Sequence, residues 1–335
     1  MKHLKKITVL LLLLSLFLVS CQGNKPEDTD TTVTDVTSET EAVTEAPPAP
    51  KTTMKVMSLN VWGGDSSTTT VDGSNKTVDG TIETRSEKLN ALLNGENIDI
   101  AGLQEMRLDW KTWMRKSMDE KYAFVGKSTR ETGEGGYVIY LKDKYTVKDS
   151  GVFWLVEGAP TSSAKDPNSN FDRMCTWVIF QVIETGEYFL FMDTHLDTVD
   201  SVRAGQATVL VGQIPVLQQT VKENYGVDNC PVILVGDMNS EIDTEPYNIM
   251  SKALCDSRVY SKGATIARDY STSPGFWYCE TESDVKRNGH YIDYIFVSKS
   301  ITVKNHKMIH TATNLCLYGE YISDHNAMIA EIQLP

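Results

Sequence analysis

The sequence has little positive charge for its length. Its 335 residues include 32 Lys and Arg against 45 Asp and Glu, which gives a formal net charge of −13. Proteins that coat nucleic acid obtain much of their affinity from Lys and Arg on the phosphates, so this balance argues against binding through bulk charge. Hydrophobic residues make up 41% of the chain. That fraction is ordinary for a globular core and excludes a fully disordered chain.

Long hydrophobic runs are absent apart from one near the N-terminus. This run, residues 7–19, is thirteen residues long, whereas a membrane-spanning helix needs about 20. It follows Lys2, Lys5 and Lys6, a pattern typical of a secretory signal peptide. The run ends in Leu18-Val19-Ser20-Cys21, which resembles a bacterial lipobox. The resemblance implies that residues 1–20 are cleaved and that a lipid on Cys21 anchors the exported chain to the outer face of a membrane in the bacterial cell envelope. A plain signal peptide or a short N-terminal anchor remains the alternative.

Aromatic residues are missing from the segment that follows. Residues 22–53 contain nine Thr, seven acidic residues and two Lys, together with Pro47-Pro48-Ala49-Pro50. Such a segment cannot bury enough apolar surface to offset its ordering entropy. We therefore expect residues 21–53 to form a disordered tether and residues 54–335 to form a single folded domain. No internal repeat is present in the sequence.

Cysteines are few, and none has the CxxC or zinc-type spacing. Besides Cys21 there are five, so at least one has no partner within the chain. Export would permit a disulfide between Cys255 and Cys279, while buried free thiols are the alternative for most of them. None has the sequence context of a catalytic nucleophile.

Strand-like and helix-like segments alternate through the domain. Two helices are predicted from apolar spacing, with a kink at Pro215 in the second, and a surface loop is expected before Thr84. Strands mixed with helices, including an antiparallel hairpin at Thr185-Gly186-Glu187, favour an α/β (α+β) fold: a four-layer αββα sandwich of two mixed β-sheets flanked by helices. The predicted helices are residues 85–97 and 201–225, and the predicted strands are residues 54–61, 98–103, 174–183, 188–194, 231–235, 291–297, 301–309 and 327–334.

Polar side chains lie at or near the ends of these apolar strands. A strand interior has little use for them, because burying an unpaired carboxylate is costly, whereas strand ends can converge on one cleft. Carboxylate and amide oxygens suit Mg²⁺, Mn²⁺ or Ca²⁺ better than zinc, which leaves the His residues free for proton transfer. The residues are Asn60, Glu105, His195, Asp237, Asn239 and Asp293, with Asp324 and His325 just before the last strand.

Each of these residues also has a purely structural explanation. Asp237 and Asn239 are compatible with an Asx turn, and Asp293 with an exposed edge strand. Glu105 is compatible with a carboxylate at a helix start. Because these explanations would have to hold independently at every strand end, the ordered set favours a functional site.

The motifs around these residues resemble the endonuclease/exonuclease/phosphatase superfamily, which includes deoxyribonuclease I, abasic-site endonucleases, bacterial sphingomyelinases and inositol polyphosphate 5-phosphatases. The resemblance covers residues 54–334, and GVFWLVEGAP with FDRMCTWVIF is similar to a secreted bacterial branch. It is carried by MSLNVWGG, AGLQEM, FMDTHLD, VILVGDMNS, HYIDYIFVS and SDHNAM.

The resemblance implies a role for each residue. Glu105 would hold the principal divalent cation, Mg²⁺ (or Mn²⁺ or Ca²⁺, one or two ions), with Asn60 beside it and Asp324 completing the metal environment. His325 would bind the phosphate or activate water, oriented by Asp293. Further, Asp237 would align the attacking water or move a proton, Asn239 and Arg173 would contact phosphate oxygens, and His195 would be a second catalytic His.

The implied activity is metal-assisted hydrolysis of phosphodiester bonds by in-line attack of water, on a nucleic acid, a nucleotide or a lipid head group. A phosphomonoester, phospholipid or inositol phosphate on the same site is the alternative, followed by a non-catalytic binding lipoprotein. The domain carries −11, which speaks against a processive nuclease. We expect a monomer.

Overall fold

The computed structural model describes residues 50–65, 69–71, 77–78, 80–118, 120–130, 133–266, 269–285 and 289–335. The predicted signal peptide, Cys21 and all but the last four residues of the predicted tether lie outside these ranges. Within the described ranges, no helix is long and apolar enough to cross a membrane.

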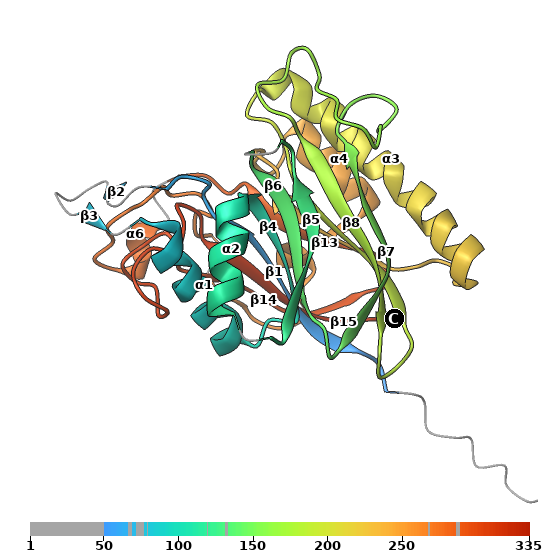
Figure 1. Cartoon of the computed structure of the whole chain (residues 1–335), viewed down its shortest axis with the longest axis horizontal. Helices are drawn as coiled ribbons and strands as arrows, with labels where there is room; N and C mark the ends of the chain where they lie inside the picture. Colours follow the sequence, from blue (N-terminus) through green and yellow to red (C-terminus); the bar gives the residue numbers. More distant parts are fainter. Residues whose placement is uncertain are drawn as a thin grey trace, which may run out of the picture. The chain divides into compact units, whose positions relative to one another are not determined.

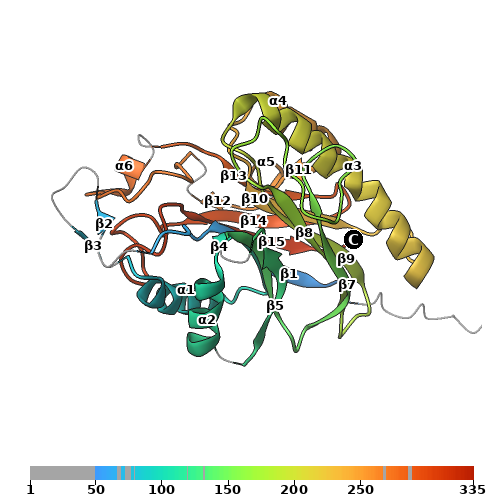
Figure 2. The ribbon, with the colours of Figure 1, turned by 45° about the horizontal axis from the view of Figure 1, so that its top comes forward.

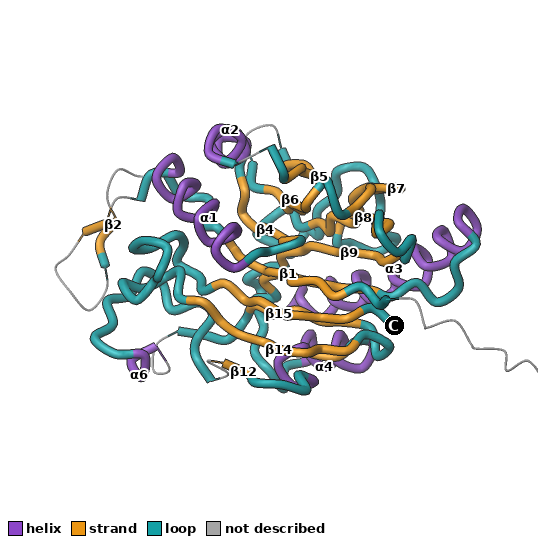
Figure 3. Tube along the Cα trace, turned by 90° about the horizontal axis from the view of Figure 1, so that it is seen from below, coloured by secondary structure: helices purple, strands orange, loops and turns teal. Residues whose placement is uncertain are grey.

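A seven-stranded mixed sheet forms one of the two central layers of the described chain (Figure 1). Its strand order is β12-β14-β15-β1-β4-β6-β5, and Figure 3 shows β14, β15, β1 and β4 side by side. The central strand β1 pairs in parallel with β4 and antiparallel with β15. The strands are β1 (Thr53–Asn60), β4 (Ile100–Met106), β5 (Tyr122–Ser128), β6 (Gly135–Leu141), β12 (Thr265–Ile266), β14 (Thr302–Ile309) and β15 (Ala327–Gln333).

A six-stranded sheet forms the other central layer, in the order β11-β13-β10-β9-β8-β7. Strand β10 is buried along its whole length, because both faces of this sheet are covered, and its VILVGD sequence is correspondingly apolar. It pairs in parallel with β9 and antiparallel with β13. The strands are β7 (Tyr145–Trp154), β8 (Met174–Val182), β9 (Tyr188–His195), β10 (Val232–Asp237), β11 (Cys255–Asp256) and β13 (Asp293–Val297).

Helices cover the outer face of each sheet (Figure 2). Helices α1 and α2 pack on the seven-stranded sheet through Leu89, Leu92 and Trp110, and α3 and α4 pack on the six-stranded sheet through Leu210 and Met250. The predicted four-layer sandwich is therefore confirmed. The helices are α1 (Ile82–Glu96), α2 (Leu108–Ser117), α3 (Asp200–Tyr225), α4 (Glu245–Ala253), α5 (Ser257–Tyr260) and α6 (Glu282–Val285), and β2 (Thr69–Thr70) pairs with β3 (Thr77–Val78).

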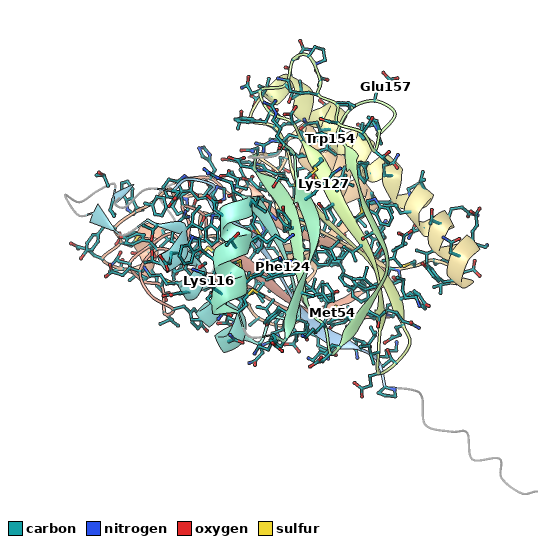
Figure 4. The ribbon with its side chains drawn as sticks, in the orientation of Figure 1. Met54, Lys116, Phe124, Lys127, Trp154 and Glu157 are labelled. Carbon is teal, nitrogen blue, oxygen red and sulfur yellow. The ribbon has the colours of Figure 1, made fainter. Side chains whose placement is uncertain are left out.

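Three apolar layers result from this arrangement. Met54 on β1 packs in the core between the sheets, whereas Phe124 on β5 packs in the core under α1 and α2 (Figure 4). The core between the sheets holds their relative position through side chains of β1, β4, β9, β10 and β13. It therefore fixes the edge at which strand ends of both sheets meet.

Most predicted elements agree with the structure to within a few residues, but the start of the first helix differs. The expected surface loop ends earlier, because Thr81 caps α1 by accepting a hydrogen bond from the Thr84 N–H at 3.3 Å. The helix predicted over residues 201–225 is α3, which contains Pro215. Cys255 and Cys279 are both free thiols, as are the other described cysteines. Strands β5, β6 and β7 and helices α2 and α4 were not predicted from the sequence.

Candidate active site where the strand ends of the two sheets meet

The six-stranded sheet brings three of the predicted residues side by side. Asp237, the last residue of β10, pairs with His195 at the end of β9 and with Asp293 at the start of β13. Because β10 is parallel to β9 and antiparallel to β13, the ends of two strands and the beginning of the third meet at one edge. The side chains of Asp237 and Asp293 are buried there, and His195 is nearly so, with 11% of its side chain exposed.

The seven-stranded sheet contributes residues to the same place. Asn60, the last residue of β1, pairs with Gln104 of β4. The next residue, Glu105, has φ +59° where the register between β4 and β6 shifts. Its carboxylate accepts hydrogen bonds from Asn60 Nδ2 at 2.8 Å and from the Gly63 N–H at 2.9 Å.

Two contacts connect the strand ends across the site. Asn60 Nδ2 also donates to Asp237 Oδ2 at 3.1 Å, which joins one sheet to the other. Ser323, in the segment before β15, donates from Oγ to the Asn60 carbonyl oxygen at 2.5 Å and accepts from the His325 N–H at 3.1 Å. Asp324 and His325 are therefore held against the end of β1.

His325 lies between two carboxylates. Its Nδ1 is 2.9 Å from Asp293 Oδ2, and its Nε2 is 3.8 Å from Asp237 Oδ2 and 3.3 Å from Ser273 Oγ. Burial opposes protonation of the ring, but the charges of Asp293 and Asp237 outweigh it and raise the pKa of His325 well above its ordinary value. Burial and the neighbouring charge of Asp293 raise the pKa of Asp237 as well. The group can therefore hold or move a proton near neutral pH.

His195 has the opposite electrostatics. Burial, and then the charges of Arg173 and His325, lower its pKa well below the ordinary value. Arg173 Nη1 lies 3.1 Å from His195 Nδ1, and Asn239 Nδ2 lies 3.0 Å from His195 Nε2. A neutral imidazole fits these contacts, because Nδ1 can accept from Arg173 while the N–H at Nε2 donates to Asp237 Oδ2, 3.3 Å away. The site therefore combines one protonated and one neutral His.

The oxygen atoms near Glu105 fit a divalent cation. Burial raises the pKa of Asp324, and the nearby charge of Glu105 raises it further. Two carboxylates that repel each other form the kind of oxygen-rich donor set that Mg²⁺, Mn²⁺ and Ca²⁺ prefer. Asn60 lies beside them with Nδ2 toward Glu105, while its Oδ1 accepts from the Trp62 N–H at 3.0 Å. A second group of possible ligand atoms, from Asp237, Asp293 and His325, lies within 4.8 Å of one another.

The structure thus brings together every residue predicted from the sequence for this site. Their roles remain predictions. The residues are Asn60, Glu105, Arg173, His195, Asp237, Asn239, Asp293, Asp324 and His325.

Four further residues at the site were not predicted. Ser323 and Ser273 contact His325 or its backbone, and Ser323 could have been suspected from its place directly before Asp324. Glu134, whose pKa is raised by burial and by Glu105, lies 4.0 Å from Arg173 Nη1. Burial lowers the pKa of Arg85, but only to about 10. This fully buried guanidinium therefore stays charged at neutral pH.

A pocket of about 320 Å³ opens beside Glu105 and His195. Among its described lining residues, three carboxylates face three guanidinium groups, so the lining carries no net charge. Arg130 pairs with Asp172, and Phe171 is 43% exposed. The charged lining residues are Glu105, Glu134, Asp172, Arg107, Arg130 and Arg173.

Comparisons with solved structures find close agreement in fold. A protein of the endonuclease/exonuclease/phosphatase family from Bacteroides vulgatus is 23% identical, with a TM-score of 0.68 over 85% of this chain and 100% of that one. A mannosyl-6-phosphatase from Bacteroides thetaiotaomicron is 25% identical, with a TM-score of 0.65 over 83% and 99% of the two chains. TDP2 from D. rerio, complexed with a single-strand DNA product, is 19% identical, with a TM-score of 0.55 over 84% and 98%.

No curated protein matches the chain. The Endonuclease/Exonuclease/phosphatase family, in contrast, matches residues 57–325, which contain every residue of the site. Members of this family are hydrolases that act on phosphate esters and generally depend on a divalent metal. With the two-sheet fold and this match over most of its length, the chain belongs to the endonuclease/exonuclease/phosphatase family.

Proposed function

We propose that this protein is a divalent-metal-dependent hydrolase of phosphodiester bonds that uses water as the nucleophile. The observation that carries the proposal is the hydrogen-bonded pair Asp293–His325 beside Asp237, which Asn60 Nδ2 joins to the Glu105 carboxylate. A proton-transfer group next to a cation site is what hydrolysis of a phosphate ester requires.

Asn60, Glu105 and Asp324 would hold the ion, which when bound supplies Lewis acidity that stabilises negative charge on the phosphate. The protonated His325 directs Nε2 into the site, because Asp293 occupies Nδ1, and can donate to a phosphate oxygen. Asp237 lies beside His325 in the same space. Its raised pKa makes it suited to accept a proton from water there. Arg173 and Asn239 supply further donors for the phosphate.

A phosphomonoester with a small polar leaving group is the second candidate. The pocket beside the site supports it, because a charge-balanced lining favours a neutral, hydrogen-bonding group over a long polyanion. The 25% identity to a mannosyl-6-phosphatase over 83% of the chain also favours a sugar phosphate.

One substrate panel separates these alternatives. We expect the full-length protein to hydrolyse bis-p-nitrophenyl phosphate with Mg²⁺ and not with EDTA. Faster turnover of p-nitrophenyl phosphate and hexose phosphates than of the diester or plasmid DNA would select the monoesterase. Glu105→Ala and His325→Ala should each lose about 10²–10³ in rate while keeping the wild-type circular dichroism. If either variant keeps activity within tenfold of wild type, the proposed site is wrong.

We further propose that the protein is exported and attached through a lipid on Cys21 to the outer face of a membrane in the bacterial cell envelope. The support is the basic, apolar and lipobox-like order of residues 2–21. In a bacterial host the wild type should sediment with membranes, whereas Cys21→Ser should be uncleaved or released. Equal membrane attachment and processing of the two would contradict lipidation. A monomeric mass in detergent is expected for the purified protein.

A further inference from the structure

A buried arginine next to the site has no role in the chemistry described above. Arg85, in the first turn of α1, is completely buried. Within the described part of the chain, its guanidinium donates to backbone carbonyl oxygens, and the carboxylates of Asp324 and Asp65 act on it through their charge. Burying a charged group in this way is expensive, so the contacts that compensate for it are informative.

Most of these carbonyl groups lie in the segment that directly follows Asn60. Arg85 Nη1 donates to the Val61 oxygen at 2.8 Å and to the Trp62 oxygen at 3.1 Å, and Nη2 donates to the Gly64 oxygen. The same segment supplies the Gly63 N–H that holds Glu105 Oε2 at 2.9 Å. Arg85 therefore fixes the backbone that orients two of the expected metal ligands, Asn60 and Glu105.

A further carbonyl group lies in the segment before β15. Arg85 Nη1 is 3.4 Å from the oxygen of Ile322, which directly precedes Ser323 and Asp324. Ser323 in turn donates to the Asn60 carbonyl oxygen. One guanidinium thus contacts both chain segments that carry Asn60 and Asp324, although these residues are far apart in the sequence.

Two indole rings hold the guanidinium in place. Arg85 Cζ lies 4.6 Å from the ring centroid of Trp62 and 4.8 Å from that of Trp110. Trp110 Nε1 also donates to the Trp62 carbonyl oxygen at 3.3 Å. Trp62 itself has φ +57°, an uncommon conformation for a bulky residue that needs support from its surroundings.

From this geometry we propose that Arg85 is a positioning residue for the divalent cation, acting through the backbone of residues 61–64 and 322. The inference rests on the proposed metal-dependent function. Lysine would retain the charge, but its three donors on one nitrogen cannot reproduce the planar arrangement of contacts that Arg85 makes. Loss of the guanidinium should release both segments and weaken binding of the ion.

The test measures binding of the metal directly. Mn²⁺ alone serves as the probe, and the free ion is quantified by electron paramagnetic resonance in titrations of the full-length protein. We expect Arg85→Lys to raise the Kd for Mn²⁺ at least tenfold, and Trp110→Phe about threefold. Arg258→Lys is the matched control: Arg258 is also largely buried, and its Cζ lies 4.0 Å from the ring of Tyr291. It should lower the melting temperature and leave the Kd unchanged.

Glu105→Gln separates failure of the inference from failure of the proposed function. If Glu105→Gln weakens Mn²⁺ binding but folded Arg85→Lys stays within twofold of wild type, the positioning role is wrong. If Glu105→Gln also leaves binding unchanged, the metal site itself is wrong. Should Arg85→Lys not fold, Trp110→Phe decides, and a Kd within 1.5-fold of wild type for that variant overturns the inference.

Discussion

Asp193 is a buried carboxyl group under the site, and its replacement by Asn should change how stability depends on pH. It lies on β9, two residues before His195, with its side chain between the sheets. Oδ1 accepts from Gln104 Nε2 at 2.6 Å, while Oδ2 has no hydrogen-bond partner in the described part of the chain. Gly136 leaves the necessary room, since a Cβ there would lie 2.8 Å from Oδ2.

The magnitude follows from the pKa. Burial raises the pKa of Asp193 from 3.8 to about 8, in spite of the hydrogen bond from Gln104. The folded protein therefore keeps a proton that the unfolded chain loses between these two values. The contribution of Asp193 to the free energy of unfolding is fully present below pH 3.8. It declines by about 1.4 kcal/mol per pH unit as the pH rises towards 8. Between pH 5 and 7.5 the decline is about 3 kcal/mol.

Urea unfolding of wild type and Asp193→Asn at steps from pH 5 to 7.5 measures this decline. Asn cannot titrate but has nearly the same shape and still accepts from Gln104. The variant should therefore gain about 3 kcal/mol relative to wild type across the range. Asp143→Asn, at an exposed turn, should follow the wild-type curve. If the wild-type and Asp193→Asn curves run parallel, Asp193 is ionised in the folded protein and the reasoning fails.

Three further predictions concern the metal, the core and the pocket. Mg²⁺ at a hundredfold excess over its Kd should stabilise the protein by about 2.7 kcal/mol. The melting temperature should rise, EDTA should reverse the rise, and Glu105→Gln should abolish it. An equal rise in Glu105→Gln would contradict the proposed metal site. Leu210→Ala removes a buried side chain of α3 and should lower the free energy of unfolding by about 2–5 kcal/mol without changing kcat. A lower kcat in the folded variant would contradict this prediction, because it would mean that packing of α3 affects the site. Phe171→Ala should raise KM for small polar substrates about three- to tenfold through loss of its exposed ring, and an unchanged KM would exclude the pocket from substrate binding.

The site residues at the ends of apolar strands could be predicted from the sequence. An apolar run and the polar residue at its end are both visible within a few consecutive residues. Asp237 follows a continuous apolar run, and His195 ends another, so their proximity follows once the strands are adjacent. Asp293 is a less direct case: it begins its strand, and it joins the others only because β13 runs antiparallel to β10. Pairing direction is not encoded within a single strand, so this arrangement required the structure.

Other residues had no local signal. Arg85 occupies a helix whose sequence is largely polar, and nothing in its spacing separates it from a solvent-exposed arginine. Its burial depends on carbonyl groups of two distant segments. Strand β7 was missed because its burial alternates unevenly and its middle contains two charged residues and a glycine, Lys148, Asp149 and Gly151. In both cases tertiary contacts override the local preference.

Half of the eight described non-glycine residues with positive φ lie where the site is built. Trp62, Glu105, Asn239 and Tyr321 all have positive φ, between +44° and +59°, a region that bulky residues occupy at a cost of about 1–3 kcal/mol each. Each lies within a few residues of, or is itself, a side chain of the site. Glycine would relieve this strain at any of these positions, but at Glu105 and Asn239 it would also remove the functional group. The packed layers therefore stabilise unfavourable backbone at the strand ends, and that backbone directs the carboxylates and amides into a common space.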